Sequence, residues 1–206
     1  MAYFPFFIDI KKKKCCIIGG GRVAYRKAEA MLGFEAEITV IAPYICEELW
    51  ELRDRLQIVN RPYAERDIED AFIVIAATDD TEVNSSVSAI CRRRNILVNV
   101  VDELEECGFL FPAYVRQGDI TIGITTSGKS PVMAGHIRRT IRDLLPDYYE
   151  ALIDTLGGYR DFIRKKVASA EVRAAIFKDL AYYGMQKEGR LTQEDVDTVL
   201  RKWEKK

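Results

Sequence analysis

Short apolar runs alternate with amphipathic stretches along the first hundred residues of the chain. The apolar runs have the length and composition of β-strands and cover residues 15–18, 37–41, 58–60, 72–77 and 96–101. Between them, apolar positions recur at the spacing of one helical face, over residues 23–32, 46–56, 65–71 and 81–94. Strands that alternate with helices in this way predict an α/β fold with a doubly wound parallel sheet.

The alternation stops after residue 102, and a different pattern follows. Ile120, Ile122 and Ile124 alternate with Thr and Gly, which is the period of a half-buried strand. An extended run over residues 109–115 precedes them. Together the two segments predict a β-hairpin with its turn at 117–119.

A helix is expected after the hairpin, ending at residue 145. Ser130 can cap it, Pro131 suits its first position, and Pro146 follows its end. Its expected apolar stripe consists of Met133, Ile137, Ile141, Leu144 and Leu145. The remaining segment, 147–206, is helical by its apolar spacing. The patterns therefore predict three domains, which span residues 1–112, 113–145 and 146–206.

The residues before the first strand carry two further patterns. Residues 3–10 are apolar with alternation, so we expect a short lead strand that lies against the sheet. The four lysines at 11–14 lack the interleaved aromatic residues of a nucleic-acid site, and they predict a solvated turn. At the start of the helix 81–94, Asp79 or Asp80 is the expected cap.

Gly19, Gly21 and Ala24 fit the spacing G-x-G-x-x-A, a permitted variant of the dinucleotide-binding fingerprint. The first glycine allows a tight turn, the second lets a pyrophosphate approach the backbone, and the small third residue lets the helix lie close to the strand. The helix N-terminus, with about half a positive charge, faces the phosphates. The context of a strand before and a helix after predicts a Rossmann-like dinucleotide-binding domain, with a plain glycine turn as the alternative.

The end of the second strand lacks the residue that commonly distinguishes NAD from NADP. A dinucleotide fold often carries Asp or Glu about 20 residues after the glycines, where it holds the ribose 2′-hydroxyl. Ile41 and Ala42 occupy that place here, and no arginine adjoins them. The sequence therefore leaves both cofactors open.

Composition narrows the classes of protein. The chain has 206 residues, 48% of them hydrophobic, which is enough for a sizeable core. Its net charge of -1 gives no overall case for nucleic-acid binding. The longest apolar runs are too short to span a membrane, and residues 1–7 lack the basic and apolar regions of a signal peptide. We therefore expect a cytoplasmic protein without nucleic-acid or membrane partners.

The five cysteines and single histidine limit metal and thiol chemistry. The cysteines are odd in number and include no C-x-x-C pair, which argues against a disulfide framework or a zinc knuckle. A catalytic cysteine would need His136 as its base, and no cluster of His and Cys is present to hold a metal permanently. No metal site is predicted.

Several blocks of sequence, taken in order, resemble the N-terminal module of siroheme synthase. The blocks read GGGRVAYRKA, VIAATDDTEVN, NVVDE, FLFPAYV and TTSGKSPVMAGHIRRTIR, and the resemblance covers about residues 3–145. That module is a precorrin-2 dehydrogenase and, in some members, also a sirohydrochlorin ferrochelatase. The helical tail is similar in kind to that of stand-alone members, and no residues remain for the methyltransferase half of the fused enzyme.

The resemblance implies an activity and a set of site residues. Precorrin-2 would lose a hydride and a proton to give sirohydrochlorin, with NAD as hydride acceptor, and some members then insert ferrous iron as a further substrate. The functional carboxylate of the family falls on Asp102. The resemblance and the glycine motif together assign the cofactor contacts to Gly19, Gly20, Gly21, Arg22, Val23, Ala24, Pro43, Tyr44, Ala77 and Thr78. The family is also a homodimer whose second domain exchanges contacts with the partner.

The residues themselves support part of this assignment. Asp102 follows the predicted strand 96–101, and the carboxyl ends of strands form the ligand edge of an open α/β sheet. It can accept a proton there, although an ordinary loop aspartate is the alternative. Arginine pairs bidentately with carboxylates and so suits a substrate with eight of them. The substrate-binding candidates are Ser127, Lys129, His136, Arg138, Arg139 and Arg142.

Each of these substrate residues also has a plainer interpretation. The three arginines are equally typical of a solvated helix face, and a lone histidine on a helix is more often a surface or packed residue. At the level of the whole chain, the alternative function is a nucleotide-sensing regulatory module without catalysis. Such modules usually hold the ribose with an acid at the end of the second strand, which is missing here. A chelatase without the redox step is a third alternative, and the intact glycine turn counts against it.

Overall fold

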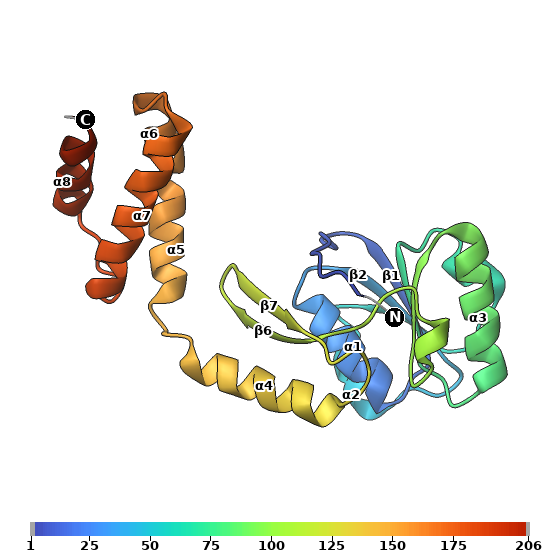
Figure 1. Ribbon diagram of the computed structural model, residues 1–206. Coiled ribbons are helices and arrows are strands. Elements are labelled where there is room, and N and C mark those ends of the chain that lie inside the picture. The colour runs from blue at the N-terminus through green and yellow to red at the C-terminus, as the bar shows by residue number, and fades with distance from the viewer. Residues whose placement is uncertain (1–2, 205–206) are drawn as a thin grey trace. The chain divides into compact units, whose positions relative to one another are not determined.

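A computed structural model describes residues 3–204 of the chain, so the ends of the predicted first and last domains, residues 1–2 and 205–206, lie outside the description. The chain divides into two compact units, Met1–Phe111 and Pro112–Lys206. Figure 1 shows the elements of both units in chain order. Within residues 3–204, no helix is both long and apolar enough to cross a membrane.

The first unit is built on a parallel sheet of five strands in the order β3-β2-β1-β4-β5. The strands are β1 (Lys14–Ile18), β2 (Glu37–Ile41), β3 (Gln57–Val59), β4 (Ile73–Ala76) and β5 (Leu97–Val100). Ile18 pairs in register with Ile41 on one side and with Ala76 on the other, and Ala76 pairs with Val100. The carboxyl ends of these strands therefore lie along one edge. This arrangement confirms the predicted Rossmann-like α/β fold.

Helices cover both faces of the sheet (Figure 1). One face packs against α1 (Arg22–Leu32) and α2 (Glu47–Glu51), with Ile17, Val40 and Ile75 in its core. The other face packs against α3 (Thr81–Arg94) and the 3-10 turn η1 (Glu65–Ile68). A second 3-10 turn, η2 (Leu104–Glu106), follows β5. As predicted, Asp80 caps α3, and its carboxylate accepts the amides of Glu82 and Val83.

The expected lead strand over residues 3–10 does not form, and that prediction is wrong. The segment has no regular structure, and Phe4 and Phe7 are 83% and 74% exposed. The strand that follows the segment, β1, already has β2 and β4 on its two sides, so the segment cannot pair beside it. Lys11 and Lys12 form the expected turn, in which Lys12 has a φ of 56°. Lys14 already begins β1, and all four lysines are exposed.

Two helices of the first unit are shorter than their patterns predicted. The helix expected over residues 46–56 ends at Glu51, and the one expected over 65–71 is the four-residue turn η1. The connection from β3 to β4 therefore carries no full helix. As a result, part of the sheet face over β2 and β3 is left uncovered.

The second unit begins with an antiparallel hairpin, β6 (Ala113–Gln117) and β7 (Ile120–Ile124), followed by α4 (Pro131–Leu144). Ser130 caps α4 as predicted, because its hydroxyl accepts the amide of Met133. The apolar face of the hairpin packs on α4, with Val115, Ile124 and Ala134 buried between them. The same chain thus covers Ile122 and Ile124. Of the predicted stripe, Met133 and Leu144 lie outside this contact and are 49% and 74% exposed.

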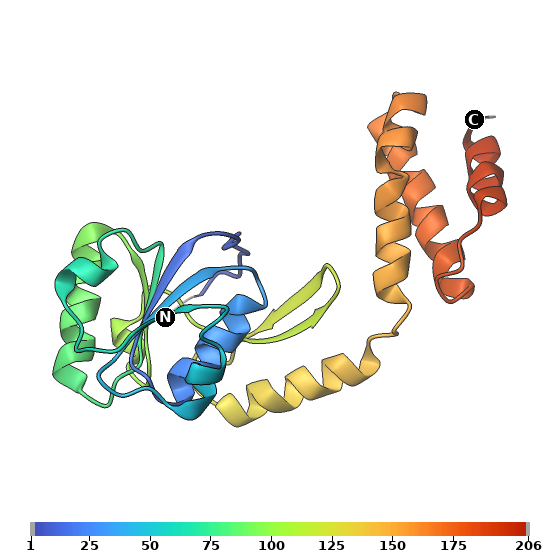
Figure 2. The same cartoon turned by 180° about the vertical axis from the view of Figure 1, so that it is seen from behind.

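Four further helices complete the second unit, as the apolar spacing of residues 147–206 predicted. They are α5 (Tyr149–Gly158), α6 (Arg160–Lys166), α7 (Ala170–Gln186) and α8 (Gln193–Glu204). Ile163, Ile176 and Leu180 are fully buried in their shared core. Figure 2 shows these helices from behind. Their core is separate from the cluster between the hairpin and α4.

Candidate cofactor site and active site

Gly19 begins the turn after β1 and has a φ of 123°, a conformation that glycine adopts far more readily than other residues. A β-carbon at this position would lie 2.2 Å from the carbonyl oxygen of Ala77. The Gly19 amide donates a hydrogen bond to the carbonyl of Ile41 at 2.9 Å. Gly19 therefore holds the ends of β1, β2 and β4 together, and the predicted residues Gly19 and Ala77 are in contact.

Gly20 contacts the loop after β2. A β-carbon on Gly20 would lie 1.9 Å from the carbonyl oxygen of Tyr44, and the Gly20 carbonyl accepts the amide of Cys46 at 2.8 Å. The Tyr44 side chain is 73% exposed beside this contact. The predicted pair Pro43 and Tyr44 thus adjoins the glycine turn.

Gly21 faces open space, unlike its two neighbours. No other described residue lies within 4 Å of the position its β-carbon would take. Gly21 is the N-cap of α1, and among the described residues no side chain caps this helix and no acid lies in its first turn. The Arg22 side chain beside it is 84% exposed and contacts Glu48 at 3.4 Å.

These features fit a dinucleotide pyrophosphate. Uncapped amides at a helix N-terminus attract anions, and the space at Gly21 admits a phosphate to the backbone. Ala24, one turn along α1, is fully buried against the sheet, as the motif predicted for close packing of helix on strand. Val23 is half-buried between these positions.

Thr78 follows β4 and is held by a residue that the sequence analysis missed. Asn84, in the first turns of α3, is only 4% exposed. Its side-chain oxygen accepts the Thr78 hydroxyl at 2.8 Å, and its amide nitrogen donates to the Thr78 carbonyl at 3.0 Å. Asn84 thereby fixes the backbone beside Gly19. The one available signal was a polar residue at a helix position whose neighbours Val87 and Cys91 are apolar.

A second missed residue, Asn60, holds the loop after β2. Its side-chain amide donates to the carbonyls of Ala42 and Pro43 at 3.1 and 3.0 Å. The loop that carries Tyr44 is therefore fixed from β3 as well as from the glycine turn. No spacing along the chain connects Asn60 with this loop, so only the fold reveals the contact.

Asp102 lies in the turn after β5. The amide of Val101 donates to the carbonyl of Ala76 at 2.9 Å, so this turn adjoins the end of β4. Asp102 has a φ of 63°, a left-handed conformation that costs an ordinary residue on the order of 1–3 kcal/mol and often marks a functional position. Its side chain is exposed, and among residues 3–204 it has no hydrogen-bond or ion-pair partner.

The first unit therefore brings the predicted cofactor residues and Asp102 to one edge of the sheet. Gly19 contacts Ala77, Gly20 contacts Tyr44, and Asp102 follows the strand paired with β4. This edge is where open α/β sheets bind their ligands. All of the predicted substrate residues, in contrast, belong to the second unit.

Ser127 and Lys129 lie in an ordered loop before α4. Ser127 and Gly128 both have left-handed backbones, with φ of 55° and 78°. The Thr126 hydroxyl spans the loop, because it donates to the carbonyl of Ser130 at 3.0 Å and accepts the Ser130 amide at 3.1 Å. Lys129 is exposed and Ser127 is half-buried. The loop therefore presents both side chains from a fixed backbone.

The three arginines of α4 are exposed, and so is His136. Arg138 and Arg142 are four residues apart and therefore share one flank of the helix, with Arg139 next to them. His136 precedes Arg138 by two residues and lies on a different side. The only ion pair formed by Arg142 in the described part of the chain is with its neighbour Asp143, at 3.7 Å. Arg139 is three residues from both Arg142 and His136, so His136 adjoins the arginines through Arg139 but lies opposite Arg138.

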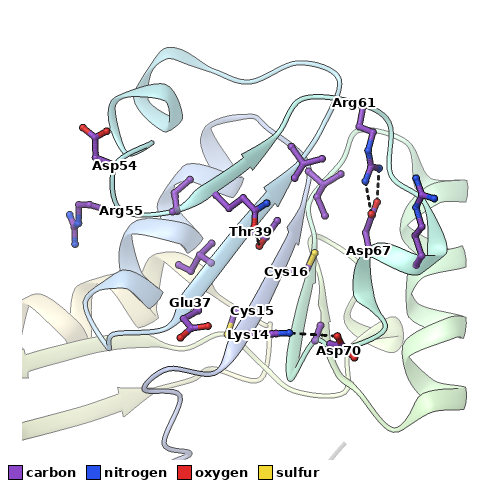
Figure 3. Close-up of a pocket in the computed structure, with 17 residues that line it drawn as sticks. Lys14, Cys15, Cys16, Glu37, Thr39, Asp54, Arg55, Arg61, Asp67 and Asp70 are labelled. Atoms are coloured by element: carbon purple, nitrogen blue, oxygen red, sulfur yellow. Dashed lines mark hydrogen bonds and ion pairs between the residues drawn. The ribbon is translucent and has the colours of Figure 1, made fainter.

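A groove of about 720 Å³ lies elsewhere in the first unit, over the uncovered part of the sheet (Figure 3). Cys16, Thr39 and Gln57 are among the residues that line it, and none of the described lining residues belongs to the predicted site. Its cationic side chains are matched by acidic ones, as in the ion pair between Arg61 and Asp67. The groove therefore follows from the short η1 and does not favour an anionic cofactor.

Cysteine and acidic side chains do not form a further centre in the part of the chain that the structure describes. Within it, no three His, Cys, Asp or Glu side chains gather in a way that would hold a metal ion. Burial raises the pKa of Cys15 and Cys91 to about 11 and that of Cys16 to about 12. These thiols are therefore protonated core residues near neutral pH.

Comparisons with known proteins agree with this geometry. Residues 6–113 match the family described as "Putative NAD(P)-binding", and residues 117–144 match the family described as "Sirohaem biosynthesis protein central". The siroheme synthase of Thioalkalivibrio sulfidiphilus is 36% identical over 182 residues, which are 87% of this chain and 37% of that protein. The siroheme synthase of a Psychrobacter species is 39% identical over 169 residues, 81% of this chain and 35% of that protein.

The chain spans little more than a third of the length of these curated relatives. Among solved structures, SirC, a precorrin-2 dehydrogenase, matches with a TM-score of 0.71 and 23% identity, over 99% of this chain and 100% of that one. At this identity the likeness establishes a common fold. The match over residues 6–113 covers more than half of the chain and includes the whole glycine turn. The resemblance to siroheme synthases is thus confirmed, and the chain belongs to the family described as "Putative NAD(P)-binding".

Proposed function

We propose that this protein is an NAD-dependent precorrin-2 dehydrogenase that forms sirohydrochlorin in siroheme biosynthesis. The observation that carries the proposal is the meeting of the glycine turn and Asp102 at one sheet edge, through the hydrogen bond from Val101 to Ala76. The relatives named siroheme synthase, and the structural neighbour named precorrin-2 dehydrogenase, supply the substrate class.

The residues of the first unit would hold the cofactor from three strand ends. The amides after Gly21 and the exposed Arg22 side chain suit the pyrophosphate. The loop with Pro43 and Tyr44 lies where the adenosine half would extend, and Ala77 and Thr78 adjoin the path toward Asp102. When bound, NAD supplies the hydride acceptor of the reaction.

NAD is the proposed cofactor in preference to NADP. The end of β2 lacks an acid, but α2 begins beside the glycine turn, because the amide of Cys46 bonds to Gly20. Two carboxylates, those of Glu47 and Glu48, lie in the first turn of α2, and hydrogen bonds from its own backbone and from Cys46 lower the pKa of Glu48. Ionised carboxylates here would repel a 2′-phosphate, so we expect NAD to bind at least tenfold more tightly than NADP.

Asp102 is the proposed general base. Its exposed carboxylate has no partner among the described residues and is therefore available to accept a proton from the substrate carbon. General-base assistance of this kind is typically worth about 10²–10⁴-fold in rate. The hydride would pass separately to the cofactor, so the role of Asp102 is limited to the proton and to the placement of the substrate.

The arginine flank of α4 is the proposed carboxylate-binding surface. Arg138, Arg139 and Arg142 are exposed on neighbouring positions, and charge-assisted bonds from guanidinium to carboxylate are among the stronger polar contacts. The loop with Ser127 and Lys129, which leads into α4, adds a hydroxyl and an ammonium. His136, three residues before Arg139, lies at the edge of this surface.

A homodimer is also proposed. Ile122 and Ile124 of the hairpin pack on α4 within one chain, so these two residues do not by themselves require a second copy. The remaining support is that the two-stranded sheet pairs only β6 with β7 in the described residues, so its outer edges can accept a strand. Val132 and Leu144 of α4 are also 79% and 74% exposed. Sedimentation at micromolar concentration would show a dimer, and a monomer would refute this proposal.

The separate cores of the second unit support a division at Pro146, into a dimerisation domain over residues 113–145 and a helical domain over 146–206. The alternative of a nucleotide-sensing module without catalysis predicts NAD binding but no turnover. The match of residues 117–144 to a sirohaem-biosynthesis family disfavours it.

An anaerobic assay tests the proposed function. Purified protein, NAD and precorrin-2 should yield the absorption spectrum of sirohydrochlorin together with NADH. NAD binding without turnover would favour the sensing module instead. A parallel reaction with sirohydrochlorin and Fe²⁺, without NAD, shows whether the same site also inserts iron as a second activity.

A further inference from the structure

Lys27 lies on α1, six residues after Gly21, and its side chain is half-buried. Its ammonium nitrogen lies 3.8 Å from the centre of the Phe111 ring. A desolvated cation over an aromatic face makes a stronger contact than an exposed one. The lysine therefore connects the helix of the glycine turn with the last residue of the first unit.

The surroundings of Lys27 include the predicted base. Burial lowers the pKa of Lys27 to about 8, while the charges of Cys107 and Asp102 act to raise it and that of Arg26 to lower it. The ammonium is therefore still protonated at neutral pH, but it loses its proton at a lower pH than an ordinary lysine does. Asp102 is thus one of the charges that act on Lys27, although the two residues come from different segments.

The segment that carries Asp102, residues 101–111, is held at its far end. We refer to it as the Asp102 loop. The Cys107 thiol donates to the carbonyl of Val100 at 3.2 Å, and the amide of Gly108 donates to the carbonyl of Val98 at 2.8 Å. Asn99 donates to the carbonyl of Phe109 at 3.1 Å, and the loop ends with Phe111 beneath Lys27.

Asp102 itself contributes little to this fixation. Its carboxylate has no hydrogen-bond or ion-pair partner in residues 3–204, and its left-handed backbone needs support from the rest of the loop. The hydrogen bonds of Cys107, Gly108 and Phe109 hold the loop to β5, and the Ser88 hydroxyl of α3 donates to the Glu106 carbonyl at 2.9 Å. Phe109 and Phe111 pack against the core cluster that includes Ala24 and Ala28 of α1, and Lys27 adds a charged contact between Phe111 and that helix.

We propose, on the basis of the proposed dehydrogenase function, that Lys27 is a positioning residue whose ammonium holds the Asp102 loop against α1 through Phe111. Lys27 acts through Phe111 and through its charge near Asp102. Its protonation keeps the general base at a fixed place relative to the glycine turn.

The proposal predicts how rate depends on pH. Above about pH 8 Lys27 becomes neutral, its contact with the Phe111 ring weakens, and kcat/KM should fall. Lys27→Arg keeps the charge and the contact with the ring at any accessible pH, so the fall should move to higher pH. Lys27→Met keeps an apolar stem without a charge, so kcat should fall at least tenfold at pH 7 while the Kd for NAD changes less than threefold.

A titration without turnover tests the contact between Lys27 and Asp102 directly. Lysines are methylated with ¹³C-formaldehyde, and their NMR signals are followed with pH in the wild type and in Asp102→Asn, with Lys27→Arg to assign the signal. Because Asp102 raises the pKa of Lys27, its loss should lower that pKa measurably. Lys166, whose exposed ammonium lies 4.9 Å from the Phe162 ring, serves as the internal control for unrelated changes.

The two measurements separate failure of this inference from failure of the proposed function. If the wild type turns over and Lys27→Met keeps the wild-type rate and pH profile, Lys27 has no positioning role and the dehydrogenase proposal stands. If the wild type shows no turnover, the proposed function is contradicted. The titration still shows whether Lys27 and Asp102 interact. An unchanged Lys27 pKa in Asp102→Asn overturns the inference in either case.

Discussion

The side chain of Asn84 makes three hydrogen bonds to Thr78, accepting its hydroxyl at 2.8 Å and its amide at 3.3 Å and donating to its carbonyl at 3.0 Å. This contact fixes the backbone where β4 meets the glycine turn. Asn84→Leu would leave buried backbone groups of Thr78 without partners, at about 1–3 kcal/mol. We expect chemical denaturation to show a loss of that size and calorimetry to show weaker NAD binding. Ser85→Ala, an exposed change on the same helix, should alter neither.

The adjacent glycines of the turn should respond differently to substitution. Gly20→Ala would place a β-carbon 1.9 Å from the Tyr44 carbonyl, so the loop must shift, and the free energy of unfolding should fall by about 1–3 kcal/mol. Gly21→Asp meets open space, so the variant should fold normally. It would bring a negative charge to the place of the pyrophosphate, and NAD affinity should fall at least tenfold, about 1.4 kcal/mol.

Thermal unfolding and calorimetry separate these outcomes. Gly21→Ala is the matched control, because it adds a β-carbon without a charge and should keep most of the stability. A folded Gly21→Asp that binds NAD as tightly as the wild type would show that the cofactor does not lie on this turn.

The ion pair of η1 should give the protein a measurable acid sensitivity. Arg61 donates to both carboxylate oxygens of Asp67, at 2.7 and 2.6 Å. This bond, with help from the Ala64 amide, lowers the pKa of Asp67 below 3.8. A carboxyl group whose pKa is lower in the folded state stabilises the fold above its unfolded pKa, and this contribution is lost as pH falls through the folded value.

Asp67→Asn should therefore lower the melting temperature by several degrees at pH 7. It should lower it by less near pH 3, which lies below the unfolded pKa of about 3.9, because part of the wild-type contribution is already lost there. Circular dichroism at the two pH values measures the difference. Asp54→Asn, on the rim of the same groove and exposed, is the control. An equal effect of Asp67→Asn at both pH values would mean that the pair does not contribute through its charge.

Reversal of charge on α4 tests the proposed carboxylate surface. Arg138→Glu and Arg142→Glu should each raise KM for precorrin-2 roughly tenfold or more, because a charge-assisted pair is replaced by repulsion. NAD affinity should stay the same. Arg201→Glu, on the exposed side of α8, controls for net charge. If steady-state kinetics show an unaltered KM in both variants, the arginines are a solvated helix face that does not bind the substrate.

Local patterns in the sequence predicted the first unit well. The strand 37–41 and the helix 81–94 coincide with the observed β2 and α3, and Ser130 caps α4 as its position indicated. These elements depend on apolar periodicity and capping, which are determined by residues close together in the sequence. Residues 3–10 show the same periodicity, yet they form no strand. Both positions beside β1, the strand that follows them, are filled by β2 and β4.

The candidate site was predictable only in part. The spacing of Gly19, Gly21 and Ala24 by itself indicates dinucleotide binding, whereas the resemblance to siroheme synthases was needed to select Asp102. Asn84 carried only a weak signal, a polar residue on the apolar side of its helix, and Asn60 could not be predicted, because the fold alone brings it near the carbonyls of Ala42 and Pro43. Lys27 was missed for the same reason, since its partner Phe111 lies 84 residues along the chain.

The central claim is that this fold oxidises precorrin-2 with NAD and uses Asp102 as the base. The most direct measurement is the anaerobic formation of sirohydrochlorin, followed by absorbance in the wild type and in Asp102→Asn side by side. We predict that the wild type forms sirohydrochlorin and NADH in equal amounts. Asp102→Asn should bind NAD with unchanged affinity but react at least about 10²-fold more slowly. A wild type that binds NAD yet forms no sirohydrochlorin would contradict the proposed function, and an Asp102→Asn rate within about threefold of the wild type would contradict the role of Asp102.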